Sequence, residues 1–411
     1  MNLFIRCLFL LLIAFNSYTQ LEDHVVGKQF SIESKVLNEH REILIYLPKG
    51  YHSSKKEYPV LYLLDGQRFQ MLGVSILESF IRNKLSPEFI IVGINTTYPD
   101  RYHHFQKTAF LEFMEKELIN HIDKTFRTTN ERILYGWEFA GGYVIESLVS
   151  KPSLFTGHIA ASPLPINITW FAEKTRIEQL DEKLKDLNSH LYFSISDEEL
   201  LEVSETTSLD SLLNKKAPHT FRWKYRVIND GSHQSTAYST LYQGLRHYFY
   251  NYPVFTIKSL NNFIDVGELE YFYRYNKSRA KRFGFSDEPE ALSVLSIIDK
   301  AMKANNLTKF SLYMNEFKSF DFISQLELNE ARRMARFYLK YKKYTEAADL
   351  YTQLARTNPR SAQIRNELGH IYLNLKDIHK AKTFFKKAVE LAEVTNDKHL
   401  SDYKSDFKPF E

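Results

Sequence analysis

Short apolar runs alternate with longer amphipathic stretches through roughly the first 250 residues. Continuous apolar runs of about four to eight residues are typical of strands that are buried on both faces. The pattern predicts strands at 43–47, 60–64, 89–94, 132–135, 158–161, 191–195 and 221–228. The polar, lysine-rich segment between the first two of these strands is interpreted as a hairpin.

Helices are predicted between the strands, first around 74–81 and then after the strand at 89–94. In the second helix the apolar residues recur every three or four positions and therefore share one face: Leu111, Met114, Leu118, Ile122 and Phe126. Alternation of strands and helices predicts an α/β fold with a mostly parallel central sheet covered by helices on both sides.

The strand pattern stops near residue 252, and the remaining chain has a helical composition. A period of 34 residues brings small and aromatic positions into register, at Met334/Leu368, Ala335/Gly369, Tyr338/Tyr372, Ala347/Ala381, Tyr351/Phe385 and Leu354/Ala388. This all-α segment resembles the tetratricopeptide family, with two repeats at 328–395 and a tail at 396–411. Two repeats rarely stand alone, so we expect the connector at 253–327 to supply further packing helices.

The N-terminus carries Arg6 followed by an apolar run at 7–15. This arrangement is typical of a secretory signal peptide, here 1–19, and the run is too short to span a bilayer. We therefore expect an exported protein, periplasmic or extracellular, with no membrane contact after cleavage and an esterase-like domain at 20–252. Cys7 is the only cysteine, so the mature chain would hold no disulfide and no cysteine nucleophile.

The charge balance argues against nucleic acid as a partner, because 54 basic residues nearly cancel 50 acidic ones. No metal or other cofactor is expected. His103 and His104 stand side by side, but without further ligands at fixed spacing they are interpreted as part of a polar loop.

The segment from Gly136 to Ala140 carries the most chemical information. A strand that ends in a sharp turn with small flanking residues and continues directly into a helix is how α/β-hydrolases present a nucleophile. Gly136 and Ala140 occupy the two small positions of the G-x-S-x-G elbow, and Glu138 stands at its apex in place of serine.

The chain resembles the putative esterase family, which includes esterase D and the enterochelin esterases, in the variant with C-terminal tetratricopeptide repeats. The resemblance covers about 30–250 and rests on YPVLYLLDG, on IIVGIN followed by Arg101, on KPSLFTGHIAASP, and on GSHQS, which contains His233. It implies a nucleophile position at Glu138 and a catalytic base at His233. The acid would be Asp197, Glu198 or Glu199, of which Glu199 is favoured.

The same resemblance implies an oxyanion hole formed by the backbone N–H groups of Phe139 and of a residue near Gln67. Because such a site favours anions, the Glu138 carboxylate could occupy it. Asp65 is explained by a strand-end turn, and neither Ser147 nor Ser162 has the surroundings of a replacement nucleophile.

Glutamate is ionised near neutral pH and attacks an acyl carbon poorly, so the favoured hypothesis is an exported esterase-family hydrolase with impaired catalysis or a non-catalytic binding role. The alternative is an active hydrolase of esters or a related electrophile that uses Glu138 and His233. Trp137 and Phe139 would line the pocket or fill a disused cleft. A small ester is the expected ligand, and the repeats would bind a protein partner; in a third reading they carry the whole function as a scaffold.

Overall fold

The computed structural model describes residues 26–96, 108–164, 189–320 and 322–410. The chain forms two compact units, Met1–Tyr250 and Asn251–Glu411. The predicted boundary at 252/253 lies two residues beyond this division. The proposed signal peptide at 1–19, with Cys7, lies outside the described residues, as do Arg101, His103 and His104.

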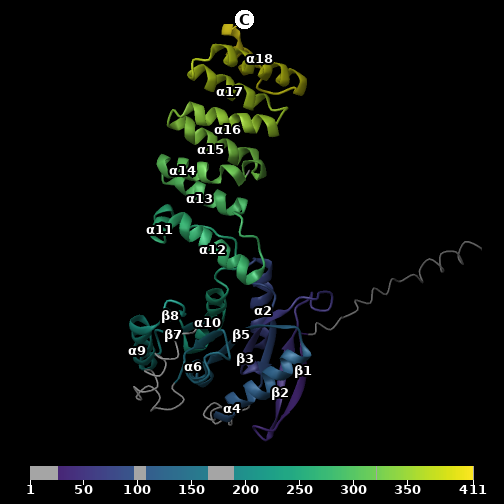
Figure 1. Cartoon of the computed structure of the whole chain (residues 1–411), viewed down its shortest axis with the longest axis vertical. Helices are drawn as coiled ribbons and strands as arrows, with labels where there is room; N and C mark the ends of the chain where they lie inside the picture. Colours follow the sequence, from purple (N-terminus) through teal and green to yellow (C-terminus); the bar gives the residue numbers. More distant parts are fainter. Residues whose placement is uncertain (1–25, 97–107, 165–188, 321, 411) are drawn as a thin grey trace, which may run out of the picture. The chain divides into compact units, whose positions relative to one another are not determined.

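The first unit is built on an eight-stranded sheet with the order β1-β2-β4-β3-β5-β6-β7-β8 (Figure 1). β2 runs antiparallel to both of its neighbours, β1 and β4, and every other neighbouring pair of the described strands is parallel. The predicted mostly parallel α/β sheet is therefore confirmed. The strands are β1 (Lys28–Ser34), β2 (Glu39–Tyr46), β3 (Tyr58–Leu64), β4 (Ile90–Ile94), β5 (Thr128–Trp137), β6 (Gly157–Ala161), β7 (His190–Ser196) and β8 (Arg222–Ile228).

One strand connection differs from the prediction. The segment between β2 and β3 is not a hairpin, because β2 pairs with β1 and β4 and does not pair with β3. The hairpin of this sheet is formed instead by β1 and β2, with Lys28 opposite Ile45. The hairpin prediction fails because β4, which comes later in the sequence, lies between β2 and β3 in the sheet.

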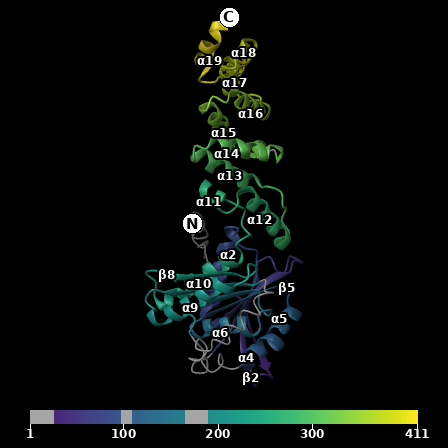
Figure 2. The same cartoon turned by 60° about the vertical axis from the view of Figure 1, so that its left-hand side comes forward.

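Helices cover both faces of the sheet (Figures 1 and 2). On one face lie α2 (Gly66–Arg82) and α10 (His233–Tyr248), whose glycines Gly73 and Gly244 approach side chains of β3 and β6. On the other face lie the helices that share the main hydrophobic core: α4 (Thr108–Phe113), the π-helix η1 (Met114–Ile119), α5 (Asn120–Thr125), α6 (Phe139–Ser150) and α9 (Leu200–Lys216).

The amphipathic helix predicted from the five apolar positions is not one continuous α-helix. A π-helical segment, Met114–Ile119, separates α4 from α5, and Phe126 lies just past the end of α5 in an extended conformation. Leu111, Met114, Leu118 and Ile122 are nevertheless buried together, so the predicted face is the core face.

The second unit is a stack of helices, from α11 to α19 (Figure 2). Its elements are α11 (Leu260–Asp265), α12 (Glu268–Phe283), α13 (Ala291–Lys303), α14 (Leu307–Glu316), η2 (Phe317–Phe320), η3 (Phe322–Gln325), α15 (Leu328–Lys340), α16 (Tyr344–Thr357), α17 (Ala362–Asn374), α18 (Ile378–Thr395), α19 (Leu400–Phe407) and η4 (Lys408–Phe410). One hydrophobic core runs from Phe255 to Ile371, so the connector at 253–327 packs against the predicted repeats.

The close approach of α17 and α18 explains the small residue at Gly369. A β-carbon there would lie 2.5 Å from the ring of Phe385, which is nearer than atoms in contact normally come. Among the helices of the described part of the chain, none is long and apolar enough to cross a membrane.

Candidate functional site

The turn between β5 and α6 holds Glu138 in a strained backbone conformation. Its φ is 56° and its ψ is −122°, a combination that costs a non-glycine residue about 1–3 kcal/mol. The turn is tight enough that a β-carbon on Gly136 would lie 2.3 Å from the Ala140 carbonyl oxygen. The Glu138 N–H donates to Ala161 O at 3.0 Å and its carbonyl accepts from Leu164 N at 3.1 Å. The sharp elbow is therefore present although its apex residue is a glutamate.

The histidine that the sequence singled out lies directly against this elbow. Nε2 of His233 is 2.6 Å from Oε1 of Glu138, and its Nδ1 contacts Oε1 of Glu199. His233 is the first residue of α10, where the Ser232 and Ser235 side chains form a capping box that fixes the start of the helix. The structure thus brings Glu138, His233 and Glu199 together in one row.

Glu199 is the acid that contacts His233. Its second carboxylate oxygen accepts hydrogen bonds from Ser196 N at 2.7 Å and from the Ser196 and Ser162 hydroxyls, each at 2.9 Å. Asp197 is exposed and accepts instead from the backbone N–H of Asp230 at 3.1 Å, and Glu198 is exposed. The buried position of Glu199 and its three donors distinguish it from the two acids that precede it.

The electrostatics of the row favour a charged imidazole. Burial acts to lower the pKa of His233, but the hydrogen bonds to Glu138 and Glu199 outweigh it and raise that pKa above the usual value. Burial acts to raise the pKa of Glu199, but the hydrogen bonds from His233, Ser196 and Ser162 lower it overall. The two acids beside His233 therefore favour its charged form.

Trp137 is a neighbour of His233 that the sequence did not reveal. Its indole N–H donates to the His233 carbonyl at 3.1 Å, and the two rings lie 4.8 Å apart. The indole is 6% exposed, and the Arg68 guanidinium lies over it at 4.9 Å. Trp137 thus fills the space behind the histidine. No periodicity signals this contact; only its position beside the elbow apex could have suggested it.

The backbone groups expected to form an oxyanion hole lie at two helix starts. Phe139 is the first residue of α6, and Gln67 is in the first turn of α2. The Gln67 side chain donates to Thr96 O at 2.7 Å and accepts from Thr96 N at 3.1 Å, which ties the end of β4 to α2. The Glu138 side chain makes no capping hydrogen bond with α6. That its carboxylate occupies the oxyanion hole stays a prediction.

Of the other polar residues near the elbow, Asp65 and Ser162 have hydrogen-bond partners, and the buried Ser147 hydroxyl has none among the described residues. Asp65 is buried at the end of β3 and accepts a hydrogen bond from the Thr96 hydroxyl. Ser162 and Ser147 are fully buried, and the Ser162 hydroxyl is directed to Glu199. Full burial sets both serines apart from an exposed nucleophile. Within the described residues, no group of three or more His, Cys, Asp or Glu side chains could hold a metal ion.

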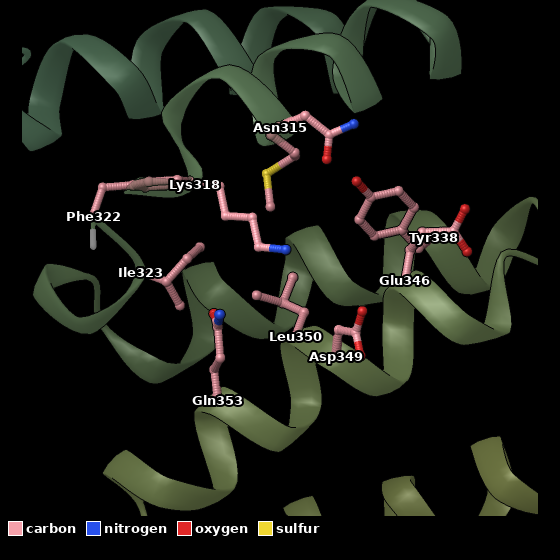
Figure 3. A pocket seen from close by; sticks show the side chains of 10 residues that line it. Asn315, Lys318, Phe322, Ile323, Tyr338, Glu346, Asp349, Leu350 and Gln353 are labelled. Carbon is pink, nitrogen blue, oxygen red and sulfur yellow. The ribbon is translucent and has the colours of Figure 1, made fainter. Parts of the chain in front are cut away.

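A separate small cavity lies in the second unit, where α14, η2 and η3 meet α15 and α16 (Figure 3). Its volume is about 110 Å³, and its rim carries Lys318 on one side and Glu346 and Asp349 on the other. Leu350 and Ile323 line its apolar part. A cavity of this size and lining accommodates a single side chain.

Sequence comparisons match the two units separately. A sequence model described as a putative esterase matches residues 34–240, and one described as a tetratricopeptide repeat matches residues 362–395. The chain is 24% identical over 187 residues to the uncharacterized protein YbbA of Bacillus subtilis (strain 168), covering 40% of this chain and 72% of YbbA.

Structure comparisons give the same fold. An IroE-like serine hydrolase from Shewanella oneidensis is 24% identical with a TM-score of 0.52, covering 72% of this chain and 99% of that one. An uncharacterised protein from Capnocytophaga ochracea DSM 7271 is 14% identical with a TM-score of 0.54, covering 92% and 99%. At these identities the likeness shows the fold alone. The matches to sequence models confirm the resemblance drawn from the sequence.

Proposed function

The chain belongs to the putative esterase family, and we propose that its esterase-like domain does not hydrolyse esters but serves as a binding module. One observation carries this proposal: the Glu138 carboxylate lies 2.6 Å from Nε2 of His233, where the hydroxyl of a nucleophilic serine would be needed. Glu138 and His233 then form an ion pair, and Glu199 anchors it.

The chemistry of the ion pair opposes ester cleavage at two points. A charged imidazole has no lone pair with which to take a proton, and the raised pKa of His233 favours this charged form. Glutamate attack on an ester would give an anhydride in place of a stable acyl-enzyme, and a carboxylate is a weak nucleophile toward an acyl carbon. The domain retains the elbow, histidine and acid but lacks the proton transfer that activates a serine.

The decisive experiment compares the wild type with Glu138→Ser on a panel of chromogenic esters. The wild type should stay at the background rate, and the variant should exceed it by about 10²-fold or more, because a hydroxyl beside His233 and Glu199 restores the proton relay. Adding His233→Ala to the Glu138→Ser variant should remove the gain. Wild-type turnover that disappears in His233→Ala would contradict the proposal.

A second candidate is a hydrolase in which Glu138 itself attacks an electrophilic carbon. It is favoured by the exposure of the Glu138 side chain, which is 22%, and by the orientation of His233 through Glu199. Mass spectrometry of the protein incubated with alkyl halides and epoxides tests it. An adduct on Glu138 that is absent in Glu138→Gln supports this candidate, and equal turnover by the two proteins removes it.

The repeat segment and the N-terminus complete the proposal. Tetratricopeptide repeats bind other proteins along their surfaces, so we assign protein contact to residues 328–395, with the connector packed against them. Cross-linking from a cysteine placed at the exposed Asp349 would identify the partner, and a chain that captures none under native conditions would refute the assignment.

N-terminal sequencing of the purified protein tests cleavage near Thr19 and therefore export.

A further inference from the structure

A second cavity lies in the first unit, at the end of the sheet opposite to Glu138. It is bounded by the start of β1, the end of β2, one side of α2 and the turn at 125–127 before β5. Thr128 at the start of β5 is paired with Tyr58 at the start of β3, so this turn marks the amino ends of the parallel strands. Glu138 follows the carboxyl end of β5, ten residues further along, on the order of 30 Å away.

The cavity has the size of a small-molecule site. Its volume is about 800 Å³, within the range of roughly 300–1,000 Å³ that is common for ligand pockets. The accessible apolar lining comes from Phe30, Leu47 and Phe126, which are partly exposed, and it adjoins the buried side chains of Ile45 and Tyr51. An apolar ligand segment would therefore lose its contact with water there.

The rim of the cavity is basic. Lys28, Lys49, His52 and Arg127 line it together with one carboxylate, Glu78. Glu78 already accepts hydrogen bonds from the Tyr46 hydroxyl at 2.7 Å and from Lys49 Nζ at 3.0 Å. Glu78 and Lys49 thus form an ion pair, and Lys28 and Arg127 give the rim its positive charge.

Arg127 is held in place without a carboxylate partner among the described residues. Its guanidinium lies over the Tyr51 ring at 3.9 Å, and it donates to Lys56 O at 3.1 Å and to Tyr51 O at 2.5 Å. Backbone carbonyls orient the planar group but do not neutralise it. A guanidinium fixed in this way is suited to a carboxylate, which it can bind through paired hydrogen bonds. Lys28, exposed at the start of β1, likewise has no acidic partner in the described part of the chain.

We propose that this cavity binds a fatty acid, with the carboxylate at Arg127 and Lys28 and the aliphatic chain along Phe30, Leu47 and Phe126. The occupant follows from charge complementarity at the rim and apolar lining within. A cationic amphiphile would contact the same apolar lining, but the positive rim would repel its head group. A neutral alcohol would contact the lining without forming an ion pair, so both should bind more weakly than a fatty acid. The site is independent of the elbow, so it stands or falls separately from the absence of ester hydrolysis.

Isothermal titration of the full chain with decanoate tests the proposal. Saturable binding at one site is expected, with decanol and decylamine each binding at least about tenfold more weakly. Arg127→Gln should weaken decanoate binding about tenfold, and Lys28→Gln about threefold. Arg222→Gln is the matched control. The Arg222 guanidinium also lies over a tyrosine ring, at 3.5 Å from that of Tyr250, but Arg222 does not line the cavity.

Two results would overturn the proposal. One is the absence of saturable decanoate binding to the wild type. The other is unchanged affinity in Lys28→Gln and Arg127→Gln; since Lys28 is exposed, its variant remains informative even if Arg127→Gln folds poorly. Photo-cross-linking with a diazirine-bearing fatty acid then locates the site: adducts at 26–30, 45–52 or 125–127 are expected, and adducts confined to the elbow would refute this assignment.

Discussion

The elbow of the first unit and the repeat stack of the second both depend on a glycine at a close approach, but they use it differently. At Gly136 the approach is to the backbone of Ala140 and shapes a turn that aims one side chain, Glu138, at His233. At Gly369 it is to the ring of Phe385 and joins two regular helices. In the elbow, one apex residue provides the side chain that contacts His233. In the repeat stack, many similar contacts between helices contribute to stability.

Under the proposed function, this difference lets the fold and the activity separate. Gly136 and Ala140 shape the elbow, whereas the residue at position 138 supplies the side chain that reaches His233. The residue at the apex could therefore change while the tight approach of Gly136 to Ala140 remains. In the repeats the packing of a small residue on an aromatic ring recurs from one helix pair to the next, so the loss of one such contact should matter less.

Gly136→Ala should be the most damaging change. The new β-carbon would lie 2.3 Å from the Ala140 carbonyl oxygen, and backbone at a tight turn cannot move aside without opening the elbow. We expect the free energy of unfolding to fall by about 3 kcal/mol or more, measured by urea denaturation with circular dichroism. Gly50→Ala is the control, because its β-carbon would meet nothing closer than Glu88 at 3.5 Å. Equal losses in the two variants would contradict the account of the elbow.

Gly369→Ala should have a smaller effect, of about 1–2 kcal/mol. A β-carbon 2.5 Å from the Phe385 ring overpacks the contact between α17 and α18, but alanine also favours the helix by about 1 kcal/mol over glycine. Thermal unfolding of the full chain measures the loss. Because the neighbour is a side chain, Phe385→Leu in the same molecule should recover part of it. Strictly additive effects of the two changes would show that the contact is not the cause.

The pH dependence of stability should show the smallest effect, below about 1 kcal/mol, since the groups of the row are partly exposed. The folded-state pKa of His233 is raised, so its contribution is fully present below the unfolded value of about 6.5 and is lost as pH rises through the folded pKa. Urea denaturation from about pH 6 to about pH 9 measures this. The wild type should lose stability more steeply than Glu138→Gln, and parallel curves would argue against the ion pair.

The sequence predicted the central strands β3, β4 and β6 because they are buried on both faces. The run Val60–Leu64 is fully buried in β3, and such runs have few alternatives. The prediction missed β1 because polar residues occupy every second position along it, at Gln29, Ser31 and Glu33, and no continuous apolar run marks the strand. The order of strands also escaped, since β4 lies between β2 and β3 in space but after both in sequence.

Sequence motifs with fixed spacing predicted some residues of the site. They could not predict residues whose side-chain direction depends on a turn of the chain. The elbow motif located Glu138, and the resemblance located His233. The three consecutive acids at 197–199 could not be told apart by spacing, because the chain turns there and only Glu199, at the start of α9, is directed inward. The contact of Trp137 with His233 and the cavity with the basic rim are formed by segments far apart in the sequence, so no local pattern predicts them.

The Trp137 indole beside the His233 imidazole could serve as an intrinsic fluorescence probe of the site. Trp137 lies 4.8 Å from the His233 ring, and an imidazolium quenches indole fluorescence more strongly than the neutral ring does. With Trp170 and Trp223, the other two tryptophans of the chain, replaced by phenylalanine, emission intensity would report the protonation of His233 directly. Any compound that enters the elbow and separates the two charges would register as a change in brightness, without a chromogenic substrate.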